Sequence, residues 1–173
     1  MIITISGLTG CGKNTLGELL AKKLGYKLVC PTFKDSAAKE RIPLMEFQKK
    51  AEKDPDIDKK FDAVLKEQAR GKCVVTTWLG PWMVNADLRI KLFVPDKVRA
   101  KRIAKRDGMS EKEALKHLKE RDDNNRKRYK KLYGINLDEN SIFDACLNGG
   151  VFTPEQLLEI TLAIINAKKT QND

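Results

Sequence analysis

The sequence has few of the residues that histidine chemistry, metal centres and membrane insertion require. It contains a single histidine, His117, so a catalytic mechanism centred on histidine has little to build on. Its four cysteines are far apart and form no C-x-x-C pair, which argues against a metal site or a disulfide framework: Cys11, Cys30, Cys73 and Cys146. No apolar run reaches membrane-spanning length, and no signal-like leader opens the chain. We therefore expect a cytoplasmic monomer with no membrane partner.

The sequence also has fewer acidic residues than basic ones. The chain has 34 lysines and arginines against 24 aspartates and glutamates, a formal net charge of +10. Such a balance favours anionic partners, which leaves nucleotides, nucleic acids and acidic protein surfaces open. A length of 173 residues with 41% hydrophobic content is enough for one domain with a proper core.

A glycine-rich turn near the start of the chain is the most informative feature that is present. Gly7, Gly12 and Lys13 fit the pattern G-x-x-x-x-G-K-[ST], but Asn14 takes its last position and Thr15 follows. Glycines let successive backbone N–H groups point inward, the next helix adds partial positive charge at its start, and the lysine reaches the β/γ-phosphates. The pattern predicts a nucleotide-binding loop, and a glycine-rich turn without a ligand is the alternative. The Mg²⁺ contact, normally made by the hydroxyl, is expected from Asn14 and Thr15.

Short apolar segments alternate with helical ones along the rest of the chain. A strand and a helix flank the glycine-rich turn, and further strands are expected over 26–29, 72–78, 87–95 and 141–148. Helices are expected over 36–53, 56–70, from 96 with a restart at 110 up to 133, and from 153. This alternation predicts an α/β fold with a parallel sheet, helices on both faces, and ligands at the carboxyl ends of the strands.

Arginines recur along the helical region that follows residue 96. Intervals of three and four place several guanidinium groups on one side of a helix: Arg99, Arg102, Arg106, Arg121, Arg126 and Arg128. For the lysines of this stretch a solvated face is the simpler explanation. The arginines fit phosphoryl transfer, because planar bidentate donors stabilise the charge that spreads over the transferring group. A phosphate loop followed by an arginine-rich helical lid is typical of a small kinase.

Six segments carry a resemblance over nearly the whole length: GLTGCGKNT, KERIPLMEFQKKAEKDPDIDKKFD, NADLRIKLFV, RAKRIAKRDGMS, ERDDNNRKRYKKLYGINLDENSIFD and FTPEQL. In this order they resemble the nucleoside monophosphate kinases, most closely the short archaeal type of cytidylate kinase. The resemblance implies one P-loop NTPase three-layer α/β domain over residues 1–173. Within it, an acceptor-binding helical lobe would be inserted at about 30–65, and an arginine-rich lid would lie at about 107–133. It also implies transfer from ATP, with Mg²⁺, to a nucleoside monophosphate, with CMP or dCMP first.

The resemblance and the residue chemistry together give three sets of site residues. The ATP set is Gly7, Leu8, Thr9, Gly10, Cys11, Gly12, Lys13, Asn14 and Thr15, with Arg102 against the donor base. The catalytic set that clamps phosphates is Lys13, Arg106, Arg121 and Arg128. The acceptor set is Lys39, Arg41, Asp58, Asp62, Trp78, Trp82 and Asn125. Within that last set the tryptophans could instead cover the end of the sheet, and an exposed polar face is the favoured role for the two aspartates.

Departures from the family pattern lie on the acceptor side. After the second strand the family usually has an arginine for the monophosphate, and this chain has Asp35 near that place. After the third strand the family usually has an acidic residue and an arginine, and this chain reads TTWLGPWM. In the lid, Asn125 stands where the family commonly has an acidic residue. Either the acceptor differs, or Lys34, Lys39 and Arg41 bind its phosphate, the last two presented by a helix from Ser36 onward. The alternative from another class is a nucleotide-dependent switch or assembly ATPase that acts on protein or RNA.

Overall fold

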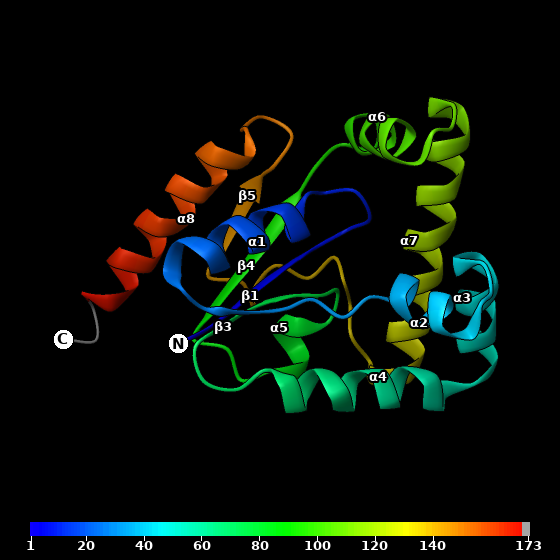
Figure 1. Cartoon of the computed structure of the whole chain (residues 1–173), viewed down its shortest axis with the longest axis horizontal. Helices are drawn as coiled ribbons and strands as arrows, with labels where there is room; N and C mark the ends of the chain where they lie inside the picture. Colours follow the sequence, from blue (N-terminus) through cyan, green and yellow to red (C-terminus); the bar gives the residue numbers. More distant parts are fainter. Residues whose placement is uncertain (171–173) are drawn as a thin grey trace.

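A parallel sheet forms the centre of the structure, a computed structural model that describes residues 1–170 (Figure 1). Its five strands are β1 (Ile2–Gly7), β2 (Lys27–Val29), β3 (Cys73–Thr76), β4 (Leu88–Phe93) and β5 (Ala145–Asn148). Their order across the sheet is β2-β3-β1-β4-β5, and every neighbouring pair is parallel. The parallel α/β sheet predicted from the sequence is therefore confirmed.

The middle strands are buried on both sides, as is usual for central strands of a parallel sheet. All of β3, with the sequence CVVT, and all but the first residue of β1, IITISG, are buried. Ile3 of β1 lies opposite Val74 of β3 on one side and Leu88 of β4 on the other. Because the strands run in one direction, the turn that follows β1 and the residues that follow β3 meet at the same edge of the sheet.

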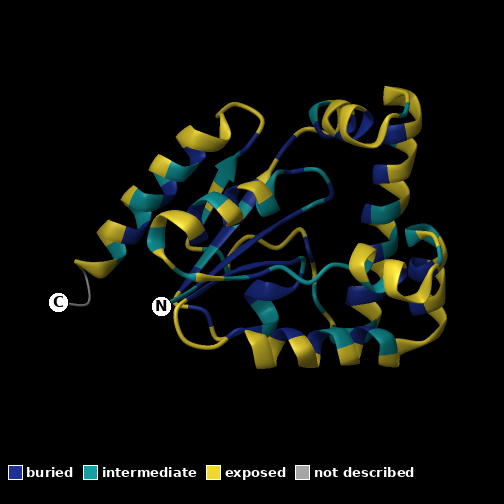
Figure 2. Ribbon diagram, in the orientation of Figure 1, coloured by how far each residue is buried: buried dark blue, intermediate teal, exposed yellow. Residues whose placement is uncertain are grey.

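Helices cover both faces of this sheet, also as predicted (Figure 1). The covering helices are α1 (Lys13–Leu24) and α8 (Pro154–Lys169) on one face, and α4 (Pro55–Gln68) and α5 (Gly80–Met83) on the other. Leu20 and Ile165 of the first pair belong to a core cluster with Ile3, whereas Leu65 of α4 packs with Val75. Figure 2 shows the buried inner sides of these helices against the buried strands and their exposed outer sides.

Four further helices stand at the carboxyl end of the sheet (Figure 1). They are α2 (Phe33–Glu40), α3 (Leu44–Lys53), α6 (Asp96–Asp107) and α7 (Glu111–Tyr133). An apolar cluster that includes Ile103, Ala114 and Leu118 joins α6 to α7. The restart predicted at Ser110 is present, because Ser110 and Glu113 form a capping box at the start of α7.

Most ends of the helices and strands differ from the prediction by one or two residues, the short helix α5 was not predicted, and two differences are larger. The single helix expected over 36–53 was wrong: Arg41 adopts φ +58° and Pro43 precedes α3, so two helices form. The last strand begins only at residue 145, because the chain before it turns, with the N–H of Phe143 donating to the carbonyl oxygen of Asn140 (3.1 Å). None of the helices within residues 1–170 has the length and apolar character needed to span a bilayer.

Candidate active site

The turn between β1 and α1 depends on glycine at two positions. Gly12 has φ +94°, which side chains rarely allow. A Cβ at Gly7 would lie 2.4 Å from the carbonyl oxygen of Leu92, so the end of β1 leaves no room for a side chain. Directly after this turn α1 begins at Lys13, and no side chain caps its first N–H groups. Uncapped N–H groups at the start of a helix form a ready site for an anion.

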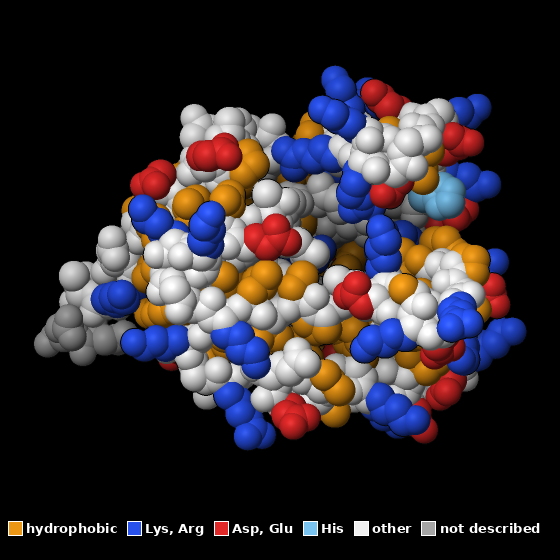
Figure 3. Space-filling view, in the orientation of Figure 1, with side chains coloured by type: hydrophobic (Ala, Val, Ile, Leu, Met, Phe, Trp, Pro, Cys, Tyr) orange, Lys and Arg blue, Asp and Glu red, His pale blue; other side chains and the backbone are white. Residues whose placement is uncertain are grey.

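A cavity of about 420 Å³ opens beside this turn, within the usual range of roughly 300–1,000 Å³ for small-molecule sites. Its lining comes from the turn, the ends of β2 and β3, and helices α2, α3, α4, α6 and α7. The carboxyl edge of the sheet therefore forms one side and the helices the other. Figure 3 shows lysine and arginine side chains gathered around the hollow beside α6 and α7.

Five cationic side chains line the cavity: Lys13, Lys34, Arg106, Arg121 and Arg128. Arg121 is the notable one, since no carboxylate within residues 1–170 forms an ion pair with it and its Nε has no hydrogen-bond partner there. Burial, together with the neighbouring Arg106, lowers the pKa of Arg121. Arg106 pairs with Asp107 (2.6 Å) but is more than half exposed. Two guanidinium groups that repel each other beside an empty space favour a bound anion between them.

The far wall of the cavity combines aromatic rings with polar side chains. Phe33 lies edge-on to Phe61, with ring centroids 5.1 Å apart. Gln48 of α3, Asp62 of α4 and Asn125 of α7 reach the cavity beside these rings. Aromatic faces with a few convergent polar groups are typical of a site for a flat heterocyclic ligand.

Arg128 is held by protein partners on several sides. Its guanidinium lies over the rings of Phe33 (5.0 Å) and Tyr129 (4.9 Å). It donates hydrogen bonds to Asn124 Oδ1 (2.6 Å) and Asn125 Oδ1 (2.9 Å), and its Nε lies 2.9 Å from Asp58 Oδ2. Arg128 therefore fixes the far wall of the cavity, whereas Arg121 forms no ion pair within residues 1–170 and keeps donors for a ligand.

Asp58 and Asp62 are buried, so the prediction that they lie on an exposed polar face was wrong. Burial raises the pKa of Asp58 to about 6, against the opposing charge of Arg128. Burial also raises the pKa of Asp62, although the hydrogen bond that Tyr133 donates to its Oδ2 (2.5 Å) acts the other way. Their partners lie on α7, about seventy residues further along the chain, where no local pattern on α4 reveals them.

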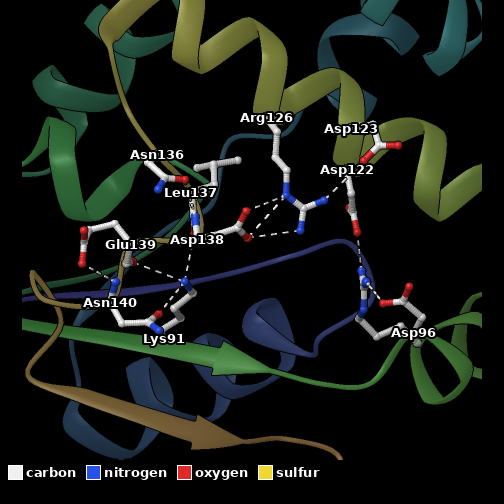
Figure 4. A network of polar contacts seen from close by, with 11 residues as sticks. Lys91, Asp96, Asp122, Asp123, Arg126, Asn136, Leu137, Asp138, Glu139 and Asn140 are labelled. Carbon is white, nitrogen blue, oxygen red and sulfur yellow. Dashed lines mark hydrogen bonds and ion pairs between the residues drawn. The ribbon is translucent and has the colours of Figure 1, made fainter.

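One buried contact that the sequence did not reveal ties the phosphate loop to α7. Arg99 and Asp122 are each 2% exposed and pair at 2.6 Å. The same arginine donates to the carbonyl oxygen of Thr9 (2.9 Å), and Asp122 Oδ1 accepts from the N–H of Thr9 (3.3 Å). Asp96 approaches Arg99 from the other side (Figure 4). The i,i+3 spacing of Asp96 and Arg99 was the available signal, but it points to a surface pair.

A second network holds the segment that follows α7 (Figure 4). Lys91 of β4 donates to the carbonyl oxygens of Leu137 (2.9 Å) and Glu139 (3.3 Å), and to Asn140 Oδ1 (2.7 Å). Arg126 of α7 pairs with Asp138 at 3.1 Å. The chain between α7 and β5 is therefore anchored both to the sheet and to the helix.

The cavity brings together ten of the residues that the sequence assigned to the site. They are Thr9, Gly10, Lys13, Asn14, Asp62, Trp78, Arg106, Arg121, Asn125 and Arg128. The others do not line it: Gly7, Leu8, Cys11, Gly12, Thr15, Lys39, Arg41, Asp58, Trp82 and Arg102. Gln48 and Thr76 line it and were not singled out. Both have a buried side-chain oxygen with no hydrogen-bond partner among residues 1–170.

The residues outside the lining have other neighbours. Arg102 donates to the carbonyl oxygens of Cys11 (3.4 Å) and Gly149 (2.7 Å), so it bridges the phosphate loop and the turn after β5. Trp82 packs edge-on against Phe143, with ring centroids 5.6 Å apart. Lys39 and Arg41 lie at the end of α2, because this helix begins at residue 33 and not at 36.

Comparison with known sequences gives full-length similarity. The cytidylate kinase-like family matches residues 2–150 of the chain. A cytidylate kinase of Pyrococcus horikoshii is 42% identical over 170 residues, covering 96% of this chain and 88% of that protein. A cytidylate kinase of Pyrococcus abyssi is 43% identical over 171 residues, with coverage of 96% and 94%.

Comparison with solved structures supports the fold. A shikimate kinase from Aquifex aeolicus superposes with a TM-score of 0.61 at 19% identity, covering 98% of both chains. At that identity the likeness shows the three-layer kinase architecture alone.

Proposed function

The chain belongs to the cytidylate kinase-like family, and we propose that it transfers the γ-phosphoryl group of ATP to CMP, with dCMP as the next acceptor. In this reaction an oxygen of the acceptor monophosphate forms a bond to the γ-phosphorus while the bond to the ADP oxygen breaks. The products are ADP and CDP, and no covalent enzyme intermediate forms. Catalysis then rests on positioning and on neutralising charge.

The observation that carries this proposal is the unpaired Arg121 beside Arg106, facing the cavity on the side that the phosphate loop closes. ATP phosphates are proposed to lie at the start of α1 with Lys13 on the β/γ oxygens. The acceptor would then occupy the wall formed by α2, α3 and α4, which carries the aromatic rings. That wall is the proposed acceptor lobe at about 30–65, and α7 with the end of α6 is the proposed lid at about 107–133.

Magnesium fits two oxygens at this site. Asn14 Oδ1 and Thr76 Oγ1 are buried, have no hydrogen-bond partner among residues 1–170, and belong to residues that line the cavity. Mg²⁺ prefers oxygen ligands and usually keeps several waters beside the substrate phosphates, where it neutralises developing charge. We propose Asn14 as one protein ligand, with Thr76 beside it. Thr15, the other expected ligand, is exposed.

A coupled assay with ATP and each common monophosphate tests the proposed function, with an arm that contains no acceptor. Turnover of CMP that depends on the acceptor supports the kinase. ATP hydrolysis without any acceptor, or ATP binding without turnover of any monophosphate, would instead favour a nucleotide-dependent switch.

The cytoplasmic location and the monomeric state of the protein stay predictions. The four cysteines are all free thiols, which fits the cytoplasmic location predicted from the sequence. A monomer is likewise expected, and sedimentation or light scattering measures it.

A further inference from the structure

Gln48 has a buried oxygen with no hydrogen-bond partner in the part of the chain that the structure describes. Its side chain is 3% exposed, it lines the cavity, and its Oε1 has no hydrogen-bond partner among residues 1–170. Leaving a buried acceptor unpaired costs free energy, so a native structure that keeps one at a cavity wall points to a ligand that pairs with it.

Two neighbouring polar side chains on the same wall have protein partners. Asp62 Oδ2 accepts from the hydroxyl of Tyr133 at 2.5 Å, and Asn125 Oδ1 accepts from Arg128 at 2.9 Å. Among these three side chains, Gln48 is the one whose buried oxygen has no hydrogen-bond partner among residues 1–170, on a residue that lines the cavity.

The surroundings of Gln48 define the donor that it would accept. Phe33 and Phe61 line the cavity on this wall and offer apolar faces to a flat ring. A nucleobase held against them presents its edge to the polar side chains. Cytosine carries an exocyclic amino group, an N–H donor, at the position where uracil carries a carbonyl oxygen. The carboxamide oxygen of Gln48 would accept from the amino group of cytosine. Against uracil the same oxygen would meet another acceptor, and the amide would have to turn so that its nitrogen faces the base.

We propose that Gln48 is a specificity-determining residue that accepts a hydrogen bond from the exocyclic amino group of the acceptor base, and so favours cytosine over uracil. This inference rests on the proposed kinase function. It concerns recognition of the base and not the chemical step, so Gln48 is expected to act on the ratio of acceptors rather than on ATP.

The test compares Gln48→Met with the parent protein, using CMP and UMP as acceptors at saturating ATP. Methionine keeps the length and volume of the side chain but removes the acceptor oxygen. We expect kcat/KM for CMP to fall about tenfold while that for UMP changes little, so that the CMP/UMP ratio falls about tenfold. KM for ATP should not change. Gln48→Glu, which retains an acceptor oxygen, should keep the preference for CMP.

A matched control comes from Thr161 of α8. Its hydroxyl is also buried and unpartnered among residues 1–170, but it does not line the cavity. Thr161→Val removes a comparable buried oxygen and should leave the CMP/UMP ratio unchanged. Calorimetric binding of CMP and UMP without ATP gives a second readout, in which Gln48→Met should weaken CMP binding alone.

The outcomes separate this inference from the function on which it rests. If the parent protein phosphorylates CMP and the CMP/UMP ratio is the same in Gln48→Met, the kinase assignment stands and the role of Gln48 is overturned. An equal loss for both acceptors would show that Gln48 only supports the packing of α3. If the parent turns over no monophosphate, both proposals fail together.

Discussion

Lys13 brings a positive charge from the phosphate loop into the cavity, where its Nζ lies 5.6 Å from the centre of the Trp78 ring. Because this charge is proposed to stabilise the transferring phosphate, Lys13→Ala should lower kcat on the order of a hundredfold. The melting temperature should barely change. Lys23→Ala, at the exposed end of the same helix, is the control and should keep full activity. Steady-state turnover within a few-fold of the parent would remove Lys13 from the catalytic set.

The raised pKa of Asp58 makes the stability of the folded protein depend on pH. Burial favours the protonated carboxyl, so the folded protein binds this proton more tightly than the unfolded chain does. The contribution to the free energy of unfolding is fully present below the ordinary pKa of 3.8 and is lost as pH rises through about 6. It should amount to something on the order of 3 kcal/mol.

Denaturation of the parent and of Asp58→Asn at several pH values isolates this contribution. Asparagine does not titrate, so the stability of the parent relative to the variant should decrease between pH 4 and pH 7. The ion pair with Arg128 forms only when Asp58 is ionised, so its contribution is already part of the titration that this comparison measures. A difference that stays flat across this range would mean that Asp58 titrates near its ordinary pKa.

At the scale of the helix, Asp35 has a role of its own in place of the expected arginine. It completes a capping box at the start of α2: Thr32 donates its hydroxyl to Asp35 Oδ2 (2.6 Å), and its own oxygen accepts from the N–H of Asp35 (3.1 Å). The first turn that this box holds carries Phe33 and Lys34, both of which line the cavity. The box therefore positions one wall of the proposed acceptor site.

We expect Asp35→Ala to lower stability by about 1 kcal/mol and to raise KM for CMP several-fold, with KM for ATP unchanged. Gln156→Ala is a matched control, because Gln156 and Thr153 form the same kind of box at the start of α8. It should cost similar stability without any change in KM for CMP. Equal kinetic effects in the two variants would show that α2 does not shape the acceptor site.

The elements that the sequence predicts well are those whose signals are local. The loop and α1 follow from glycine spacing and helical periodicity, and α7 follows from the capping box at Ser110. The break between α2 and α3 also has a local signal, Pro43, which disfavours helix at the residue before it. The prediction missed it because the polar residues on either side remain compatible with one helix.

The site was predictable only in part for the opposite reason. The phosphate loop and Arg121 lie on elements with strong patterns, whereas the burial of Asp58 and Asp62 depends on distant partners. On α4 these aspartates share a face with the fully buried Leu65, a position that favours apolar side chains unless an ion pair or hydrogen bond compensates. Gln48 was missed for the same reason, since only the fold reveals that its oxygen is buried.

At the scale of the whole molecule, α7 connects three parts that are distant in sequence. Asp122 reaches the phosphate loop through Arg99, Arg126 pairs with Asp138 after the helix, and Arg128 lies against Asp58 of α4. The proposed lid therefore contacts both the donor loop and the acceptor wall. A substitution in α7 should therefore alter both the stability of the molecule and the binding of both substrates.

Asp122→Asn tests this connection, because it removes one charge of a buried pair and keeps the shape of the side chain. Arg99 would remain buried beside the loop with only the half-exposed Asp96 to compensate it. We expect a loss of about 3 kcal/mol in the free energy of unfolding and a several-fold higher KM for ATP, since the single amide oxygen can no longer accept from both Arg99 and the N–H of Thr9. Asp123→Asn is the control on the next residue, where the carboxylate is exposed and pairs loosely with Arg126 (3.5 Å). Chemical denaturation and initial rates at varied ATP measure both effects. Should Asp122→Asn lose stability with no change in KM for ATP, the pair would hold the helices together without positioning the loop, and the proposed coupling between lid and phosphate loop would be wrong.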